Sequence, residues 1–127
     1  MKLFHQGLTG VLPVSDFDAV RAFYEDRLGL PKTQEWTDRT GNRRARFYVT
    51  GGGSIELHEN DASLPQGPTS FWMEAADING LYSALQKMGG MDLFDPIEDK
   101  YFHARSFQMR DPAGNATFVV AYEQNVR

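Results

Sequence analysis

The chain has 127 residues, of which 41% are hydrophobic, 24% charged and 13% aromatic, and its formal net charge is −4. This length and composition are typical of one globular domain and exclude a disordered or collagen-like chain. The mildly acidic balance provides no basic field for nucleic acid, and the absence of cysteine excludes disulfides, thiolate metal sites and cysteine nucleophiles. No segment approaches the roughly 18 apolar residues of a membrane span, and residues 1–7 lack a secretory apolar run, so we expect a cytoplasmic protein without a membrane partner.

The first half of the chain predicts a strand, a helix and further strands. The strand covers Leu8 to Val14, and Ser15 or Asp16 can cap the helix that follows. Apolar residues at helical spacing continue to a glycine stop, at Phe17, Val20, Tyr24, Leu28 and Gly29. Strand-like runs then cover residues 43–50 and 54–58.

The second half repeats this order. A strand over residues 69–75 precedes a helix that Asp77 can cap, and strands over 104–110 and 116–122 follow. The helix has its apolar stripe at Ile78, Leu81, Leu85 and Met88 and ends at Gly89-Gly90. Asp16 and Asp77 are 61 positions apart, as are Gly29 and Gly90. We therefore predict an α+β fold of two βαβββ modules.

The two modules are expected to form one domain over residues 1–127. The repeats cover about 7–58 and 69–123, and the linker over 59–68 is rich in turn and breaker residues. One module alone would leave a sheet face and a sheet edge uncovered. The modules should therefore pair within one chain or exchange between two chains, and we expect a homodimer.

Three motifs in this order resemble the vicinal oxygen chelate superfamily, which holds glyoxalases, extradiol dioxygenases, fosfomycin-resistance enzymes and bleomycin-resistance proteins. They are Leu12-Pro13-Val14-Ser15-Asp16, Phe23-Tyr24 followed by Leu28-Gly29-Leu30, and Asp111-Pro112-Ala113-Gly114-Asn115. The similarity covers about residues 7–123. It implies that the two modules form a cupped mixed sheet. It says less about activity, because one fold hosts many sites.

The resemblance also implies where a metal would bind. Metal-binding members use two strand positions in each repeat, which correspond here to Thr9, Glu56, Ser70 and Phe118. Because Glu56 alone is an ordinary ligand, the resemblance implies a degenerate metal site and no cofactor. A rebuilt divalent-metal site is the alternative, with Glu56, His58 and either His5 or His103.

Strand alternation predicts which side chains share the cup, because residues two apart face the same side of a sheet. Aromatic surface together with a few polar groups suits a polar organic ligand. The predicted ligand-binding residues are Arg46, Tyr48, Glu56, His58, Trp72, Glu74, Gln108, Phe118 and Tyr122. Trp36 and Phe102 are further stacking candidates from loops. The structural alternative is that Arg46, Glu56 and Glu74 satisfy one another across neighbouring strands and that the aromatic residues are core.

The segment over residues 91–104 is rich in acidic and aromatic residues, among them Asp92, Phe94, Asp95, Glu98, Asp99, Tyr101 and Phe102. In bleomycin-resistance proteins, which the chain resembles, an acidic aromatic groove at the dimer interface holds a cationic drug. A solvated connecting strand is the alternative interpretation of this segment.

These observations favour a metal-independent protein that binds a small organic molecule, with cationic molecules and antibiotics among the expected ligands. An alternative is a metal-dependent lyase, isomerase or dioxygenase with displaced ligands, in which Glu56 is catalytic. Such an enzyme would be a glyoxalase-like lyase or isomerase, whereas we favour a protein without catalysis. A third interpretation is a partner-binding protein whose cup is filled by Trp72, Phe118 and Tyr122.

Overall fold

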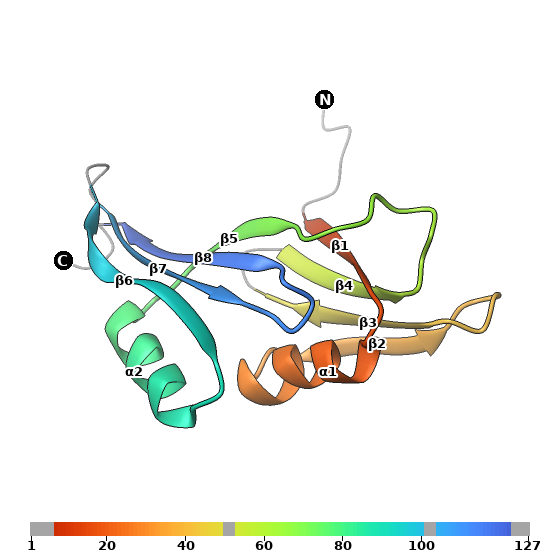
Figure 1. The fold of residues 1–127 in the computed structure, drawn as a ribbon, viewed down its shortest axis with the longest axis horizontal. Helices are drawn as coiled ribbons and strands as arrows, with labels where there is room; N and C mark the ends of the chain where they lie inside the picture. Colours follow the sequence, from red (N-terminus) through yellow and green to blue (C-terminus); the bar gives the residue numbers. More distant parts are fainter. Residues whose placement is uncertain (1–6, 50–52, 101–103, 123–127) are drawn as a thin grey trace. The chain divides into compact units, whose positions relative to one another are not determined.

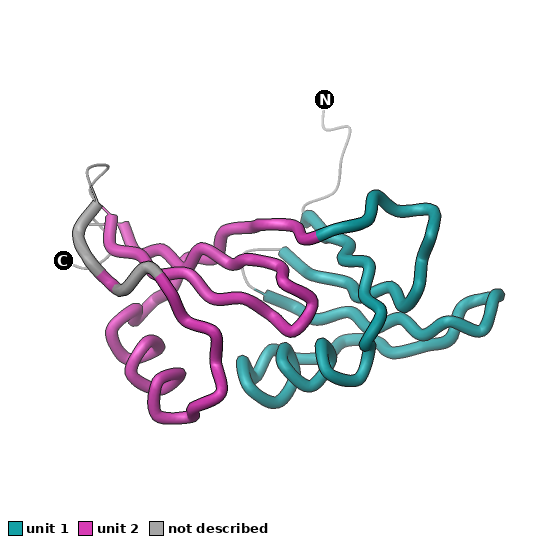
Figure 2. Tube along the Cα trace, in the orientation of Figure 1, with its two compact units in different colours: residues 1–67 teal, residues 68–127 magenta. Residues whose placement is uncertain are grey.

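The computed structural model describes residues 7–49, 53–100 and 104–122, with the backbone alone at residues 95, 96 and 98–100. The chain separates into two compact units, residues 1–67 and 68–127 (Figure 2). Each unit contains a four-stranded mixed sheet and helical segments in the order βαβββ (Figure 1). The predicted α+β fold with two βαβββ modules is therefore confirmed.

Unit 1 contains β1 (Leu8–Val14), α1 (Phe17–Ala22), β2 (Lys32–Thr37), β3 (Arg43–Tyr48) and β4 (Gly53–Glu59). The sheet order is β1-β4-β3-β2, with β1 parallel to β4 and the other pairs antiparallel. Asp16 caps α1, because its carboxylate accepts a hydrogen bond from the Ala19 N–H at 3.2 Å. The predicted strand over residues 8–14 agrees with β1.

The helix of unit 1 differs from the expected single α-helix. After Ala22 the chain continues as a π-helix over Phe23–Arg27, labelled η1. Phe23 and Tyr24 are adjacent in sequence and both are buried, and their rings meet edge to face with centroids 5.0 Å apart. A strict α-helical stripe through Phe17, Val20 and Tyr24 does not include Phe23. The wider π turn thus accompanies the burial of two consecutive aromatic residues.

The core of unit 1 lies between α1 and one face of the sheet. Its buried members include Leu12, Val14, Phe17, Val20, Phe47, Ile55 and Leu57. Arg43 fastens the helix to the sheet, since its guanidinium bonds to Asp18 at 2.9 Å and Glu59 at 2.8 Å and lies 4.6 Å from the centre of the Phe17 ring. Because the apolar core occupies the face of the sheet that α1 covers, the opposite face is available for polar residues.

Unit 2 contains β5 (Ser70–Glu74), α2 (Ile78–Met88), β6 (Asp92–Lys100), β7 (Ala104–Arg110) and β8 (Ala116–Tyr122). The sheet order is β5-β8-β7-β6, with β5 parallel to β8. The carboxylate of Asp77 caps α2 by accepting from the Gly80 N–H at 3.0 Å, and Gly89 ends the helix with a positive φ of 73°. The predicted helix and both C-terminal strands are confirmed.

The core of unit 2 lies between α2 and one face of its sheet. Buried members include Ile78, Leu85, Phe107, Met109 and Val119, and the Tyr82 ring meets Phe107 at 4.9 Å. None of the helices in the described part of the chain is long and apolar enough to cross a membrane.

A buried polar turn joins β7 to β8. The carboxylate of Asp111 accepts hydrogen bonds from the backbone of Ala113 and Asn115 and, at 2.8 Å, from the Asn115 side chain. The Asn115 amide oxygen in turn accepts from the Thr69 N–H at 2.8 Å. The turn therefore holds the segment that leads into β5.

Candidate functional site

Each sheet has an open face, which we define as the face opposite the helix of the same unit. On the open face of unit 1, the register pairs Arg46 with Glu56, Arg44 with His58, and Tyr48 with Ser54. Glu56 and His58 are buried, whereas the Tyr48 side chain is 43% exposed. Three predicted ligand-binding residues, Arg46, Glu56 and His58, are thus neighbours.

The Glu56 carboxylate is engaged on both oxygens. Oε1 accepts from the Arg46 guanidinium at 2.6 and 2.8 Å, and Oε2 lies 2.5 Å from Nε2 of His58. Arg46 and Glu56 therefore form the cross-strand ion pair that the structural alternative predicts. Burial would raise the pKa of Glu56, but the hydrogen bonds from His58 and Arg46 outweigh it and hold the pKa below its usual value. A carboxylate held ionised in this way is a weak general base.

His58 lies between two carboxylates. Its Nε2 faces Glu56, and its Nδ1 lies 2.9 Å from Oδ2 of Asp61. Asp61 also accepts from the Ser63 backbone and hydroxyl, and these bonds, together with His58, lower the pKa of Asp61 to about 2. Arg44 approaches the same carboxylate at 3.7 Å. We call Arg46, Glu56, His58, Asp61 and Arg44 the ionic chain.

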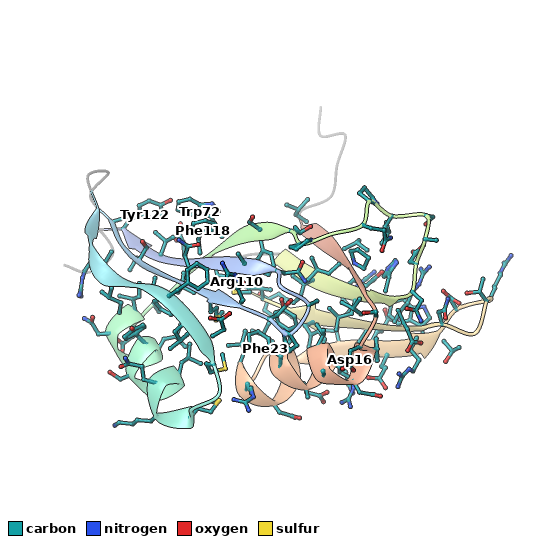
Figure 3. All side chains as sticks on the ribbon, viewed as in Figure 1. Asp16, Phe23, Trp72, Arg110, Phe118 and Tyr122 are labelled. Carbon is teal, nitrogen blue, oxygen red and sulfur yellow. The ribbon has the colours of Figure 1, made fainter. Side chains whose placement is uncertain are left out.

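The open face of unit 2 has an aromatic character instead. The register aligns Trp72, Phe118, Gln108 and Phe94 across its four strands, and we call these residues the aromatic row. The rings of Trp72 and Phe118 stack with centroids 5.3 Å apart and planes 15° apart. Both lie on the side of the sheet away from α2, and the Trp72 side chain is 57% exposed (Figure 3).

Arg110 adds a cation beside the aromatic row. Its guanidinium carbon lies 4.3 Å from the centre of the Phe94 ring, and half of its side chain is exposed. Among the described side chains, its nearest carboxylate oxygen belongs to Asp92, at 3.8 Å, which is longer than a hydrogen bond. The face of the Phe94 ring thus holds the cation beside the aromatic row, with about half of the Arg110 side chain accessible.

The remaining predicted residues are distributed over both units, and some lie outside the described residues. Glu74 is exposed on β5, and Gln108 and Tyr122 are partly buried on β7 and β8. Trp36, expected in a loop, is partly buried in β2. Other expected sites lie outside the described residues, namely His5, Tyr101, Phe102 and His103, as do the side chains of Asp95, Glu98 and Asp99.

Sequence reasoning missed the residues that complete both clusters. Asp61 belongs to the predicted linker, and it reaches His58 because Asn60 adopts a positive φ of 50°. Asn is one of few residues that tolerate this conformation, so His58-Glu59-Asn60-Asp61 contained a usable signal. Phe94 was named as part of the segment over residues 91–104, but its contact with Arg110 was missed because no pairing of this segment with β7 was predicted.

The described residues include no group of three or more His, Asp or Glu side chains that could hold a metal ion. Of the four family ligand positions, Thr9 and Ser70 are exposed on β1 and β5. The third, Glu56, is bonded as above, and the fourth, Phe118, is stacked on Trp72.

The comparison with known families agrees with the motifs and the fold. Residues 5–117 match the model of the Glyoxalase/Bleomycin resistance protein/Dioxygenase superfamily. The chain belongs to this superfamily. No curated protein matches the chain in sequence.

Solved structures of this superfamily resemble the chain in fold. TnmS3, an antibiotic binding protein from Streptomyces sp. CB03234, has a TM-score of 0.81 at 19% identity, over 96% of this chain and 99% of that chain. A superfamily member from Sphaerobacter thermophilus DSM 20745 has a TM-score of 0.80 at 23% identity, over 94% and 99%. A lactoylglutathione lyase from Agrobacterium tumefaciens has a TM-score of 0.71 at 22% identity, over 97% and 98%. A binding protein and an enzyme thus share the scaffold of this superfamily member.

Proposed function

We propose that this superfamily member binds a small organic molecule without a metal ion. The observation that carries the proposal is the stacked pair of Trp72 and Phe118 on the open face of unit 2, in which Trp72 is 57% exposed. Tryptophan combines a large apolar ring with a polar N–H and is enriched at binding surfaces, so a stacked and exposed pair of rings provides a contact surface for a ligand. In this proposal the aromatic row supplies the contact surface, and polar side chains beside it orient the ligand.

Two observations support metal independence. Both oxygens of Glu56 are engaged by Arg46 and His58, and Phe118 offers a metal no donor atom. The hydroxyls of Thr9 and Ser70 are weak ligands that do not make up for these losses. The residues at the four ligand positions therefore do not fit a divalent metal, and we propose that the ancestral metal site is degenerate.

The likeness to TnmS3 supports antibiotics as the first ligands to test. The proposed role is drug sequestration by a cytoplasmic homodimer. A metal-dependent lyase, isomerase or dioxygenase is the second candidate. The similarity in fold to the lactoylglutathione lyase is the reason to test it.

The test uses Trp72 as its own reporter. The chain has two tryptophans, so Trp36→Phe leaves Trp72 as the sole source of tryptophan emission. This variant is titrated with antibiotics and small aromatic metabolites in the presence of EDTA, and thermal unfolding is followed in parallel. We expect at least one compound to quench Trp72 and raise the Tm, and Trp72→Ala to weaken its binding about 10-fold. No response across the panel would reject the proposal.

A separate arm tests the metal. The wild-type protein is titrated by calorimetry with nickel, zinc, manganese and ferrous ions, and we expect no stoichiometric binding. One ion bound per chain at micromolar affinity or better, lost in Glu56→Gln, would favour the enzyme instead.

A further inference from the structure

Two side chains of opposite charge lie on either side of the aromatic row. Arg110 follows Gln108 by two positions on β7, and Glu74 follows Trp72 by two positions on β5. The register places Arg110 level with Ala116, and Glu74 level with Val120, so they lie on opposite sides of Phe118 along β8. Since each step of two residues spans about 6.7 Å, the two charged positions are about 13 Å apart along the strands.

Arg110 is arranged to bind an acceptor group. Its guanidinium carbon lies over the Phe94 ring, 4.3 Å from the ring centre, and about half of the side chain is exposed, so its N–H groups are accessible to a ligand. The distance of 3.8 Å to Asp92 is too long for a hydrogen bond, so that pair is a loose one between two half-exposed side chains. A carboxylate or a similar oxygen group on a ligand would complete the guanidinium fork.

Glu74 offers the opposite charge at the other side of the row. It is exposed at the edge strand β5 and forms no ion pair with another described side chain. By strand alternation it shares the open face with Trp72, two residues before it. A basic group on a ligand stacked against Trp72 could therefore pair with this carboxylate.

We infer that the ligand is a flat aromatic molecule with an anionic or acceptor group at one end and a basic group at the other. The inference rests on the proposed function and specifies its ligand. The rings lie on Trp72 and Phe118, the acceptor meets Arg110, and the basic group meets Glu74. Because the chain has a net charge of −4, its overall field repels anions, so recognition of an acid must come from a local cation.

Three naphthalene probes and calorimetry at pH 7 test the inference. The probes are 2-naphthoate, 2-naphthylmethylammonium and 6-(aminomethyl)-2-naphthoate, which carries both charges. We expect the doubly charged probe to bind most tightly. Arg110→Gln should weaken the binding of the two probes that carry a carboxylate about 5- to 10-fold and spare the ammonium probe. Glu74→Gln should weaken the two probes that carry an ammonium group by a similar factor and spare 2-naphthoate.

Arg105→Gln is the matched control. Arg105 lies on β7 like Arg110, but its guanidinium bonds to Asn79 of α2 at 2.8 Å, on the other side of the sheet. The variant therefore makes the same change of net charge away from the aromatic row, and we expect all three affinities to stay unchanged. The Tm of every variant confirms that it is folded.

The outcomes separate this inference from the proposed function. If Arg110→Gln and Arg105→Gln weaken naphthoate equally, or if no probe distinguishes the variants, the two-charge assignment is overturned while aromatic binding stands. If none of the naphthalene probes binds but a compound of the antibiotic panel quenches Trp72, the assignment of a flat aromatic ligand with two charged ends is again overturned. If nothing binds in either experiment, the proposed function falls as well.

Discussion

At the scale of single residues, Glu56 illustrates how context decides what a functional side chain can do. The family position and the residue type both favour a ligand or a base. Its carboxylate is instead buried and bonded to Arg46 and His58, and its pKa is held low. The ion pair with Arg46 was predictable from strand alternation, because the two residues are register partners. The extension to Asp61 was missed because Asp61 was assigned to the linker, although Asn60 is a residue type that tolerates the positive φ of the turn.

The ionic chain makes a prediction about pH. The pKa of Asp61 is about 2 in the folded protein against an ordinary value of 3.8, so its ionised form stabilises the fold above pH 4. This contribution is lost as the pH falls from 4 towards 2. We expect Asp61→Asn to lower the free energy of unfolding at pH 6 and the difference from wild type to shrink below pH 4. Denaturant titrations across this range measure both values.

Asp26→Asn serves as the control for this prediction. Asp26 is exposed in η1 and its carboxylate makes no hydrogen bond or ion pair with another described residue, so the variant should follow the wild-type pH profile. If the difference in the free energy of unfolding between Asp61→Asn and wild type stays constant from pH 6 to pH 2, the lowered pKa of Asp61 is contradicted.

At the scale of elements, sequence reasoning located every described strand except β2 and β6. β7 alternates in its sequence and β8 is a nearly continuous apolar run, and both strands begin and end where the sequence predicts. The bounds of β2 and β6 were missed. Both are edge strands, β2 is mostly exposed with Trp36 as its one large apolar residue, and β6 contains Pro96. β1 and β5 are edge strands as well, but each directly precedes a helix with a recognisable Asp cap, which marked their positions in the sequence.

The turn between β7 and β8 is an element with a measurable contribution to stability. The side chain of Asn115 is almost completely buried and bonds to both Asp111 and the Thr69 N–H. Asn115→Ala leaves the buried Asp111 carboxylate and the partly buried Thr69 N–H without this partner. We therefore expect a loss of roughly 1–3 kcal/mol in the free energy of unfolding. Urea denaturation measures it. Pro112→Ala, at an exposed position in the same turn, should change stability far less.

At the scale of the whole molecule, the duplicated layout carries the expectation of a dimer. Among the described strands, those at the edges of each sheet have one side without a paired strand, and β1 combines this with Leu8, which is 81% exposed. Unpaired strand edges with exposed apolar residues favour association.

We therefore expect light scattering at micromolar concentration to give twice the mass of the chain. Leu8→Glu places a charge on β1, and we expect it to shift the mass towards the monomer. Met88→Glu makes the same kind of change at the exposed end of α2 and should leave the mass unchanged. A monomeric wild-type mass would end the dimer hypothesis.

The parallel pairing of β1 with β4 and of β5 with β8 also bears on which strands unfold first. Leu8 pairs with Gly53 and Ser70 with Ala116, so each of these pairings closes a loop of about 45 residues, whereas short connections join β3 to β4 and β7 to β8. The long closures cost more chain entropy and lie at sheet edges. In amide hydrogen exchange, β1 and β5 should therefore lose protection first, which would make the first strand of each unit its earliest point of local unfolding.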